Sequence, residues 1–239
     1  MNIIADTHTH TVASSHAHST LLENLAFARE KGLKAMACTE HGPDLFDGPN
    51  LAYFRTEIRC FPDSLYGVKL LRGCEANVRK DGSLDIPANI LSALDIVIAS
   101  MHSCIFTPDS DRQVTDAWLT VAKNPDVDII GHLGNNLFIC DYETVIKAFK
   151  EYEKVVEINS SSFICRPGSH KNCREIVKLC MKYGVMLTVS SDAHIATEVG
   201  AFEHSVALLE ELGVPEELVI NSDLDRFAEF VQSKSPRKA

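Results

Sequence analysis

The 239-residue sequence lacks any long apolar run. No uninterrupted run exceeds four residues, whereas a transmembrane helix needs roughly 18 to 20. The first ten residues, MNIIADTHTH, reach polar and histidine-bearing sequence before an apolar segment can develop. That start does not have the form of a secretory signal peptide. We therefore expect a protein that does not span a membrane, and we expect it in the cytoplasm.

Basic residues and paired cysteine motifs are also scarce. There are 23 Lys and Arg against 33 Asp and Glu, giving a formal net charge of -10. This balance argues against the broad basic surface needed to bind long nucleic acid or an anionic membrane. The eight cysteines have irregular spacings and form no CxxC, which argues against a zinc ribbon or a disulfide framework. Free thiols in a reducing compartment are the better interpretation, with Cys38, Cys74 and Cys180 as buried small apolar residues.

No proline-rich or serine-rich linker divides the chain, and no internal repeat is present. Hydrophobic residues make up 45% of the sequence, enough for a sizeable core, which excludes intrinsic disorder. The length fits one large domain. We therefore expect a single domain over residues 1–239, with a frayed basic tail from about residue 233 to 239.

Short β-branched apolar runs alternate with amphipathic stretches along the chain. This alternation is typical of parallel strands joined by crossover helices. The predicted strands are residues 2–6, 33–39, 68–75, 95–101, 127–132, 155–159 and 185–192. The predicted helices are residues 19–32, 113–124, 142–154, 172–184, 202–213 and 223–234. A DG turn within residues 77–87 predicts a hairpin after the third strand.

Histidines and acidic residues gather at the carboxyl ends of these strands. Six of the seven predicted strands deliver such a residue at that end. A closed barrel brings all strand ends into one mouth, where barrel enzymes build their active sites, whereas an open sheet would separate the first and seventh strands. We therefore expect an α/β fold, a seven-stranded barrel of the TIM type, with a metal site at the carboxyl mouth. The candidate ligands are His8, His10, His16, His41, Glu75, His102, His132, Asp192 and His194.

This donor set suits zinc, manganese or iron. Nine ligands exceed what one four-coordinate metal can use, so the pattern predicts two or three metals. His8 and His10 lie two residues apart on an extended segment, which directs both side chains to the same side. A lone histidine is more often a hydrogen-bonded residue than a ligand, and we interpret His18, His170 and His204 in that way. The metal interpretation rests on the repetition of the pattern across strands.

With these residues in view, the sequence resembles the PHP (polymerase and histidinol phosphatase) family of metallohydrolases, and most closely its YcdX-like branch. Eight blocks in family order span nearly the whole chain, which makes the resemblance strongly specific. The blocks are DTHTH at 6–10, ASSHAHSTL at 13–21, TEHGPD at 39–44, RGCEANV at 72–78, MHS at 101–103, GHLGN at 131–135, EINSSSF at 157–163 and SDAH at 191–194.

The resemblance implies a distorted seven-stranded (β/α) barrel that holds three metal ions, usually described as zinc, and hydrolyses phosphoesters. Manganese and iron are the alternative metals. The resemblance makes His8, His10, Glu75 and Asp192 ligands of one metal, with Glu75 bridging to a second metal held by His102 and His132. His16, His41 and His194 would hold the third. The sequence departs from the family pattern at Glu40, where TDHG is usual, and at Leu133, where HPGN is usual.

A charge sum favours phosphate independently of the resemblance, because such a metal site carries an excess of about four positive charges. We therefore expect a phosphatase of small phosphorylated substrates that uses a metal-activated hydroxide as nucleophile. Asn159, Ser160 and Arg166 are candidates to contact the phosphate. Asp6 and Glu40 are candidates to orient ligand imidazoles.

Two other functions stay open. An amidohydrolase-like barrel acting on amides or lactones also opens with HxH, although its usual bridge is a carboxylated lysine and no Lys ends the third or fourth predicted strand. A non-catalytic metal-bound module is the other. A homo-oligomer is compatible with the sequence, which fixes neither the oligomeric state nor the physiological substrate.

Overall fold

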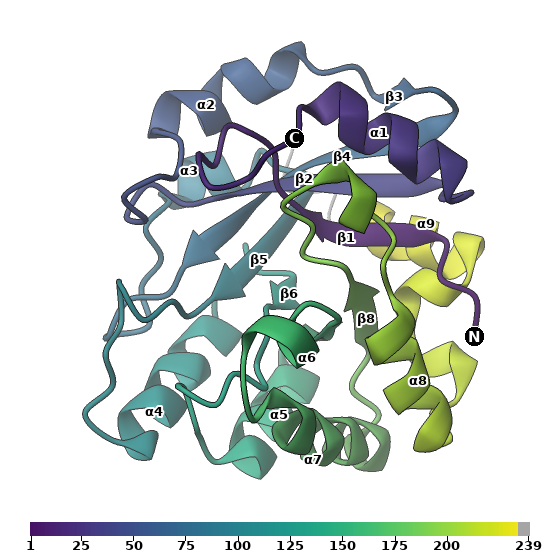
Figure 1. The fold of residues 1–239 in the computed structure, drawn as a ribbon. Helices are drawn as coiled ribbons and strands as arrows, with labels where there is room; N and C mark the ends of the chain where they lie inside the picture. Colours follow the sequence, from purple (N-terminus) through teal and green to yellow (C-terminus); the bar gives the residue numbers. More distant parts are fainter. Residues whose placement is uncertain (234–239) are drawn as a thin grey trace.

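The computed structural model describes residues 1–233, and a barrel of parallel strands forms its centre (Figure 1). Within these residues, seven strands pair in parallel in the order β1-β2-β4-β5-β6-β7-β8, and β3 adds to β4 in antiparallel orientation. The strands are β1 (Ala5–Thr9), β2 (Ala35–His41), β3 (Ser64–Leu65), β4 (Val68–Asn77), β5 (Ile96–Ser100), β6 (Ile129–Ile130), β7 (Val155–Asn159) and β8 (Leu187–Ser190). All seven predicted strands are therefore present, and their parallel pairing is confirmed.

The first and last strands meet and nearly close the barrel. Thr9 on β1 forms a parallel bridge with Ala193, just beyond the end of β8. The backbone N–H of Asp192 donates to the carbonyl of His8 at 3.0 Å, and the N–H of His10 donates to the carbonyl of Ala193 at 2.9 Å. The expected barrel, rather than an open sheet, is confirmed, and it is nearly closed.

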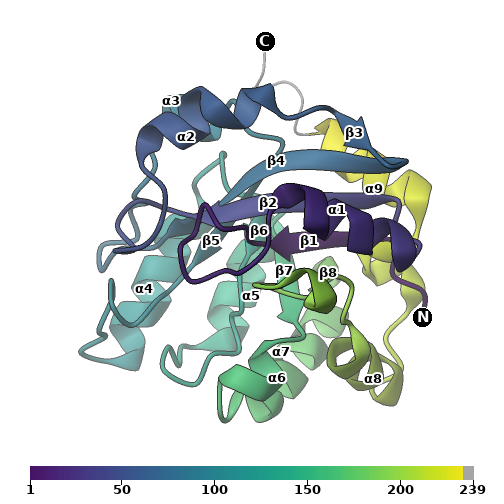
Figure 2. The same ribbon diagram turned by 45° about the horizontal axis from the view of Figure 1, so that its top comes forward.

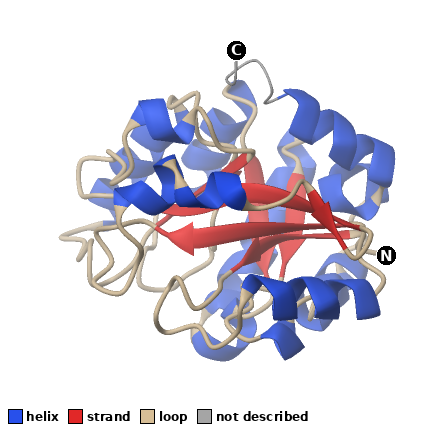
Figure 3. Cartoon of the chain, turned by 90° about the horizontal axis from the view of Figure 1, so that it is seen from above, coloured by secondary structure: helices blue, strands red, loops and turns tan. Residues whose placement is uncertain are grey.

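Helices surround the strands, as Figure 3 shows from above. The α-helices are α1 (Leu21–Glu30), α2 (Leu51–Arg55), α3 (Ala88–Leu91), α4 (Asp111–Ala122), α5 (Tyr142–Glu151), α6 (Ser162–Cys165), α7 (Ser169–Tyr183), α8 (Glu203–Glu211) and α9 (Leu224–Ser233). The short 3-10 helices are η1 (Glu57–Cys60), η2 (Ala196–Glu198), η3 (Glu216–Leu218) and η4 (Ile220–Ser222). The six longer α-helices correspond to the six predicted ones, and α1 lies against β2 (Figure 2).

Local sequence sets several helix ends. Thr20 caps α1 in a reciprocal capping box with Glu23, which satisfies N–H groups that the first turn leaves unpaired. Gly184 ends α7 with a φ of 66°, a conformation that costs glycine little. The predicted hairpin over 77–87 is a tight turn closed by the single antiparallel bridge between Val78 and Leu84.

The barrel interior is apolar near the start of the strands and polar near their carboxyl ends. A buried apolar cluster inside the barrel includes Ala5, Leu71 and Ile98, and Phe227 of α9 packs in the same cluster. Farther along the same strands the buried residues become polar, as at Glu75 on β4. The apolar layer thus provides the packing, and the polar layer is left to carry the site.

None of the helices in the described part of the chain is long and apolar enough to cross a membrane. The frayed tail expected at the end of the sequence falls almost entirely on residues 234–239, which lie outside the described residues.

Candidate metal centre

The structure brings all nine predicted ligands to the carboxyl mouth of the barrel. They come from the ends of β1, β2, β4, β5 and β6 and from the segments that follow β1 and β8. Their donor atoms form a continuous chain of short separations with Glu75 at its middle.

A β-bulge in β1 turns the HxH pair inward. Asp6 pairs with Met36 and Thr9 with Cys38, so β1 has one more residue than β2 between these two points. One extra residue reverses which side chains face the interior. Ala5 faces the apolar barrel interior before the bulge, and His8 and His10 face the mouth after it.

The first group of donor atoms is compact. Nε2 of His8 lies 3.0 Å from Nε2 of His10. It lies 3.4 Å from Oε2 of Glu75 and 3.5 Å from Oδ1 of Asp192. Nε2 of His10 lies 3.6 Å and 3.3 Å from the same two oxygens. A tetrahedral zinc with bonds of 2.0–2.2 Å places its ligand atoms about 3.4 Å apart, so these four atoms fit one ion.

The second group forms around the other oxygen of Glu75. Oε1 lies 3.0 Å from Nε2 of His132 and 3.4 Å from Nε2 of His102. The ring of His102 is held by its other nitrogen, because Nδ1 lies 2.7 Å from the side-chain oxygen of Asn77. The two carboxylate oxygens of Glu75 thus face different donor groups, which is the arrangement of a bridging ligand.

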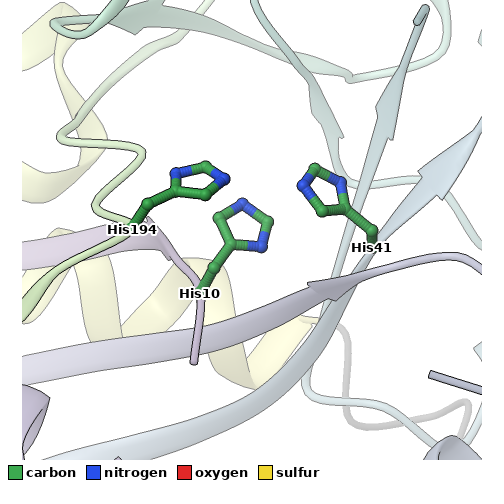
Figure 4. Close-up of side chains that lie close together, drawn as sticks. All are labelled: His10, His41 and His194. Atoms are coloured by element: carbon green, nitrogen blue, oxygen red, sulfur yellow. The ribbon is translucent and has the colours of Figure 1, made fainter. Parts of the chain in front are cut away.

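A third group lies nearer the opening. Nε2 of His16 is 2.8 Å from Nε2 of His194 and 3.2 Å from Nε2 of His41. His10, His41 and His194 also converge, as Figure 4 shows, with ligand atoms within 4.8 Å of one another. Nδ1 of His41 lies 2.6 Å from Oε2 of Glu75, which joins this group to the first.

The surroundings of the cluster favour an ionised Glu75 and neutral imidazoles at His10 and His132. Although burial opposes it, the imidazoles of His8 and His41 hold the pKa of Glu75 well below its usual value. Burial and the neighbouring His41 hold the pKa of His10 well below its usual value. Burial likewise lowers the pKa of His132 to about 4. Deprotonated carboxylates and imidazoles are the forms that bind metal.

Three buried polar atoms in the cluster make no hydrogen bond of good geometry within the described residues. These atoms are Oε2 of Glu75, Nδ1 of His10 and Nδ1 of His41. A buried polar atom without a hydrogen-bond partner is costly, and a cation placed between these nitrogen and oxygen atoms would satisfy them. The residues present therefore fit divalent metal ions.

Three residues that the sequence interpretation missed support the ligands. Oε1 of Glu157 lies 2.6 Å from Nδ1 of His8, and its Oε2 accepts from the backbone N–H of His132 at 2.6 Å. Asn77 holds His102, and Oδ2 of Asp47 lies 2.6 Å from Nδ1 of His16. A carboxylate in the apolar run VVEIN was the sequence signal for Glu157, whereas Asp47 sits in a loop and gave none.

Asp6 and Glu40, which we expected to orient ligand imidazoles, instead accept hydrogen bonds from the backbone and hydroxyl groups of nearby segments. The carboxylate of Asp6 accepts from the backbone N–H and hydroxyl of Ser191, which ties β1 to the segment after β8. Glu40 accepts from the backbone N–H and hydroxyl of both Thr11 and Ser14. Its side chain therefore fixes the loop that leads from His10 towards His16. Neither carboxylate has a hydrogen bond to a ligand imidazole ring, so that expectation is wrong in its direct form.

The three candidate phosphate contacts separate in the structure. Arg166 reaches the mouth, where Nη2 donates to Oδ2 of Asp192 at 3.0 Å. Asn159 is buried and donates to the same oxygen at 3.1 Å. Ser160 lies elsewhere, because its hydroxyl accepts from the backbone N–H of Ser205 in α8.

A cleft of about 430 Å³ opens above the donor groups. Imidazoles of the ligand set and the Arg166 guanidinium form part of its lining. Its full lining is His16, His41, Leu45, Phe46, Asp47, Met101, His102, Ser103, Cys104, Asn135, Arg166 and His194.

The model of the PHP domain family matches residues 6–161, which include seven of the nine candidate ligands and the supporting Glu157. The chain belongs to the PHP domain family. Its sequence relatives include a protein named probable phosphatase from Caldanaerobacter subterraneus subsp. tengcongensis, 45% identical over 99% of this chain and 94% of the relative. A probable phosphatase from Clostridium botulinum is 42% identical over 100% of this chain and 98% of the relative.

Solved structures share the fold at lower identity. Histidinol phosphate phosphatase from Lactococcus lactis, solved with zinc, L-histidinol and phosphate, has a TM-score of 0.67 and 20% identity over 89% of this chain and 95% of that one. A chain of an archaeal ribonuclease P complex with mature tRNA has a TM-score of 0.63 and 13% identity over 96% of this chain and 91% of that one. At these identities the likeness concerns the fold alone.

Proposed function

We propose that the protein is a metal-dependent phosphatase that hydrolyses small phosphomonoesters at a centre of three metal ions, with zinc as the expected metal. The relatives named probable phosphatase make the enzyme class plain: the chain is a hydrolase of phosphoric esters. The single observation that carries the number of metals is the position of Glu75, whose two oxygens face two donor groups while a third group stands beside them.

The proposed ligand sets divide the nine residues. His8, His10, Glu75 and Asp192 would hold one ion, Glu75, His102 and His132 a second, and His16, His41 and His194 a third. Divalent ions held by these residues would lower the pKa of bound water and would stabilise charge on the attacking and leaving oxygens of a phosphoryl transfer. The histidinol phosphate phosphatase that contains zinc and phosphate has the same fold and supports zinc as the first metal to test.

Arg166 is the protein group proposed to bind the phosphate. Its side chain is 18% exposed at the mouth, and it holds Asp192 and the hydroxyl of Ser162. A guanidinium has five N–H donors, so these contacts leave donors for a phosphate oxygen. Its positive charge adds to that of the metal ions, so an anionic phosphoryl group gains more from this site than a neutral acyl group does.

Size and charge of the molecule favour a small substrate. The formal net charge of -10 repels a polyanion at a distance, whereas a small anion that enters the cleft meets the local positive field. Three exposed free thiols, Cys60, Cys104 and Cys165, fit a reducing compartment, and we place the protein in the cytoplasm.

The test compares initial rates on p-nitrophenyl phosphate and p-nitrophenyl acetate, with and without added zinc or manganese. We expect metal-dependent hydrolysis of the phosphate that inorganic phosphate inhibits. Faster metal-dependent turnover of the acetate without inhibition by phosphate would instead favour the amidohydrolase-like function. Binding of metal without turnover of any small ester would favour a non-catalytic module.

A further inference from the structure

Phe46, in the loop after β2, is the most exposed large apolar side chain of the described residues. It is 92% exposed, whereas Leu45 is 7% exposed and the side chain of Asp47 is 8% exposed. A single exposed apolar residue is common on protein surfaces, so exposure alone indicates nothing. Two further observations indicate a function for this exposed ring: its position beside the cleft and the bonds that hold its loop.

The loop is fastened on both sides of Phe46. On one side Arg79 binds Asp44 through two contacts, Nε to Oδ2 at 2.6 Å and Nη2 to Oδ1 at 3.1 Å. On the other side the carbonyl of Asp47 accepts from the N–H of Ser15, and its carboxylate holds His16. The backbone that carries the phenyl ring is therefore held in place before any ligand arrives, which lowers the entropy cost of a contact with the ring.

Phe46 is one of three apolar residues with large side chains in the lining of the cleft that opens above the donor groups. Leu45, Phe46 and Met101 line the cleft together with His16 and Arg166. The lining of the cleft thus combines cationic and metal-binding groups with apolar side chains. A phosphomonoester has the same two parts, an anionic phosphoryl group and a leaving group.

We propose that Phe46 is a specificity-determining residue that receives the leaving group of the substrate, and that this leaving group carries a flat aromatic or heteroaromatic ring. The inference rests on the proposed phosphatase function and narrows its substrate class. A phosphoryl group near the ligand residues leaves the rest of the ester in the cleft, which Phe46 lines. Aromatic rings bury large apolar area and gain further from ring–ring contact.

The ring of Phe46 can be changed without disturbing the interior. Within residues 1–233 it belongs to neither buried hydrophobic cluster, so its removal leaves no cavity. Phe46→Ala should therefore fold with an unchanged melting temperature. Phe46→Tyr keeps the ring and serves as the conservative variant.

The experiment measures binding of phenethylphosphonate and ethylphosphonate to the metal-loaded protein by calorimetry. The two ligands cannot be hydrolysed and differ only in a phenyl ring. We expect the wild-type protein to bind phenethylphosphonate more tightly. Phe46→Ala should weaken phenethylphosphonate by about five- to tenfold and ethylphosphonate by less than about twofold, and Phe46→Tyr should restore the contrast.

Leu224→Ala is the matched control, because Leu224 is also exposed but begins α9 beyond the start of the strands, away from the mouth. It should change neither affinity. Equal wild-type affinities for the two phosphonates, equal weakening of both by Phe46→Ala, or no binding of either ligand would overturn the inference.

Hydrolysis of phenethyl phosphate and ethyl phosphate separates this inference from the proposed function. Their leaving groups are both primary alcohols, so a difference in kcat/KM reports on recognition. Hydrolysis of both esters with no dependence on Phe46 overturns the inference and leaves the phosphatase function standing. Hydrolysis of neither ester, with the phosphonate contrast present, overturns the phosphatase function instead.

Discussion

Nδ1 of His8 lies 2.6 Å from Oε1 of Glu157, and this contact crosses the interior of the barrel from β7 to β1. Glu157 also holds the backbone of His132, so one carboxylate supports proposed ligands of two different ions. Burial alone would lower the pKa of His8, but the carboxylates of Glu157, Asp192 and Glu75 hold it well above its usual value. The same negative charge that retains a proton on His8 in the metal-free protein favours a metal cation there.

Glu157→Gln should therefore weaken metal binding. The amide removes the charge that orients His8, and loss of such a supporting contact costs about 10- to 100-fold in metal affinity. Titration of the metal-free protein against a chromophoric chelator measures the effect. Glu217→Gln, a change of an exposed glutamate in η3, is the control and should bind metal as the wild type does. Unchanged affinity in Glu157→Gln would remove Glu157 from the support of the site.

Protein purified without chelator should contain about three metal ions per chain, because three donor groups are present. Removing the metals should lower the melting temperature. A site saturated at 100 times its dissociation constant contributes about 2.7 kcal/mol, and for a chain of this size that corresponds to roughly 5–10 °C. Elemental analysis and thermal denaturation with and without chelator check both points. A reproducible content of one metal or none contradicts the three-metal proposal.

Glu75→Gln should reduce phosphatase turnover about 100-fold or more, because the amide cannot carry the negative charge of a bridging carboxylate. His204→Gln is the comparison. His204 is exposed on α8 and contacts the ring of Phe163 rather than the metal cluster, so its replacement should leave turnover within about twofold. Circular dichroism verifies that both variants are folded. Equal losses at the two positions would show that Glu75 has no special place in the site.

The low pKa of His132 predicts a pH-dependent stability in the metal-free protein. Burial lowers that pKa from 6.5 to about 4, so the folded state stays neutral at pH 5 while the unfolded state takes up a proton. The contribution of His132 to the free energy of unfolding of the metal-free protein therefore decreases as pH falls below 6.5. At pH 5 it is about 2 kcal/mol lower than at pH 7.5.

His132→Asn removes this proton uptake and suits the position, because His132 has a φ of 27° and asparagine tolerates a positive φ. Urea denaturation at pH 7.5 and pH 5.0 should show a smaller loss of stability on acidification in the variant than in the wild type. The same loss in both proteins would mean that His132 is not the group that responds.

The barrel and the gathering of the nine residues could be predicted because both follow from one-dimensional patterns. Strand periodicity and strand order place carboxyl ends together whatever the details of packing. Glu157 was missed because it lies two residues before the end of its strand, where only the inward-facing parity of that strand reveals it. The contact of Asp47 with His16 joins two loops, and no local rule places loops against each other.

The bulge in β1 shows a different limit. The alternation of side chains along a strand correctly predicts that His8 and His10 point to the same side. It does not predict that Ala5 also points into the barrel, because the bulge adds one residue between Ala5 and His8. The hydroxyl of Ser160 accepts from the backbone N–H of Ser205 in α8, which lies 45 residues later in the sequence, so its local sequence could not reveal this contact.

The hydrogen bonds that join β1 to the segment after β8 also determine the order in which the ligand residues come together. Asp6 and Ser191, which form one of these bonds, are 185 residues apart in the sequence. The ribosome therefore delivers His8 and His10 early, but Asp192 and His194 join them only after nearly the whole chain has emerged. Contacts of such long range form late, since the loop between them must first be ordered. A nascent or truncated chain without these bonds has an incomplete set of the proposed ligands, so full affinity for the proposed metal ions would require the finished barrel.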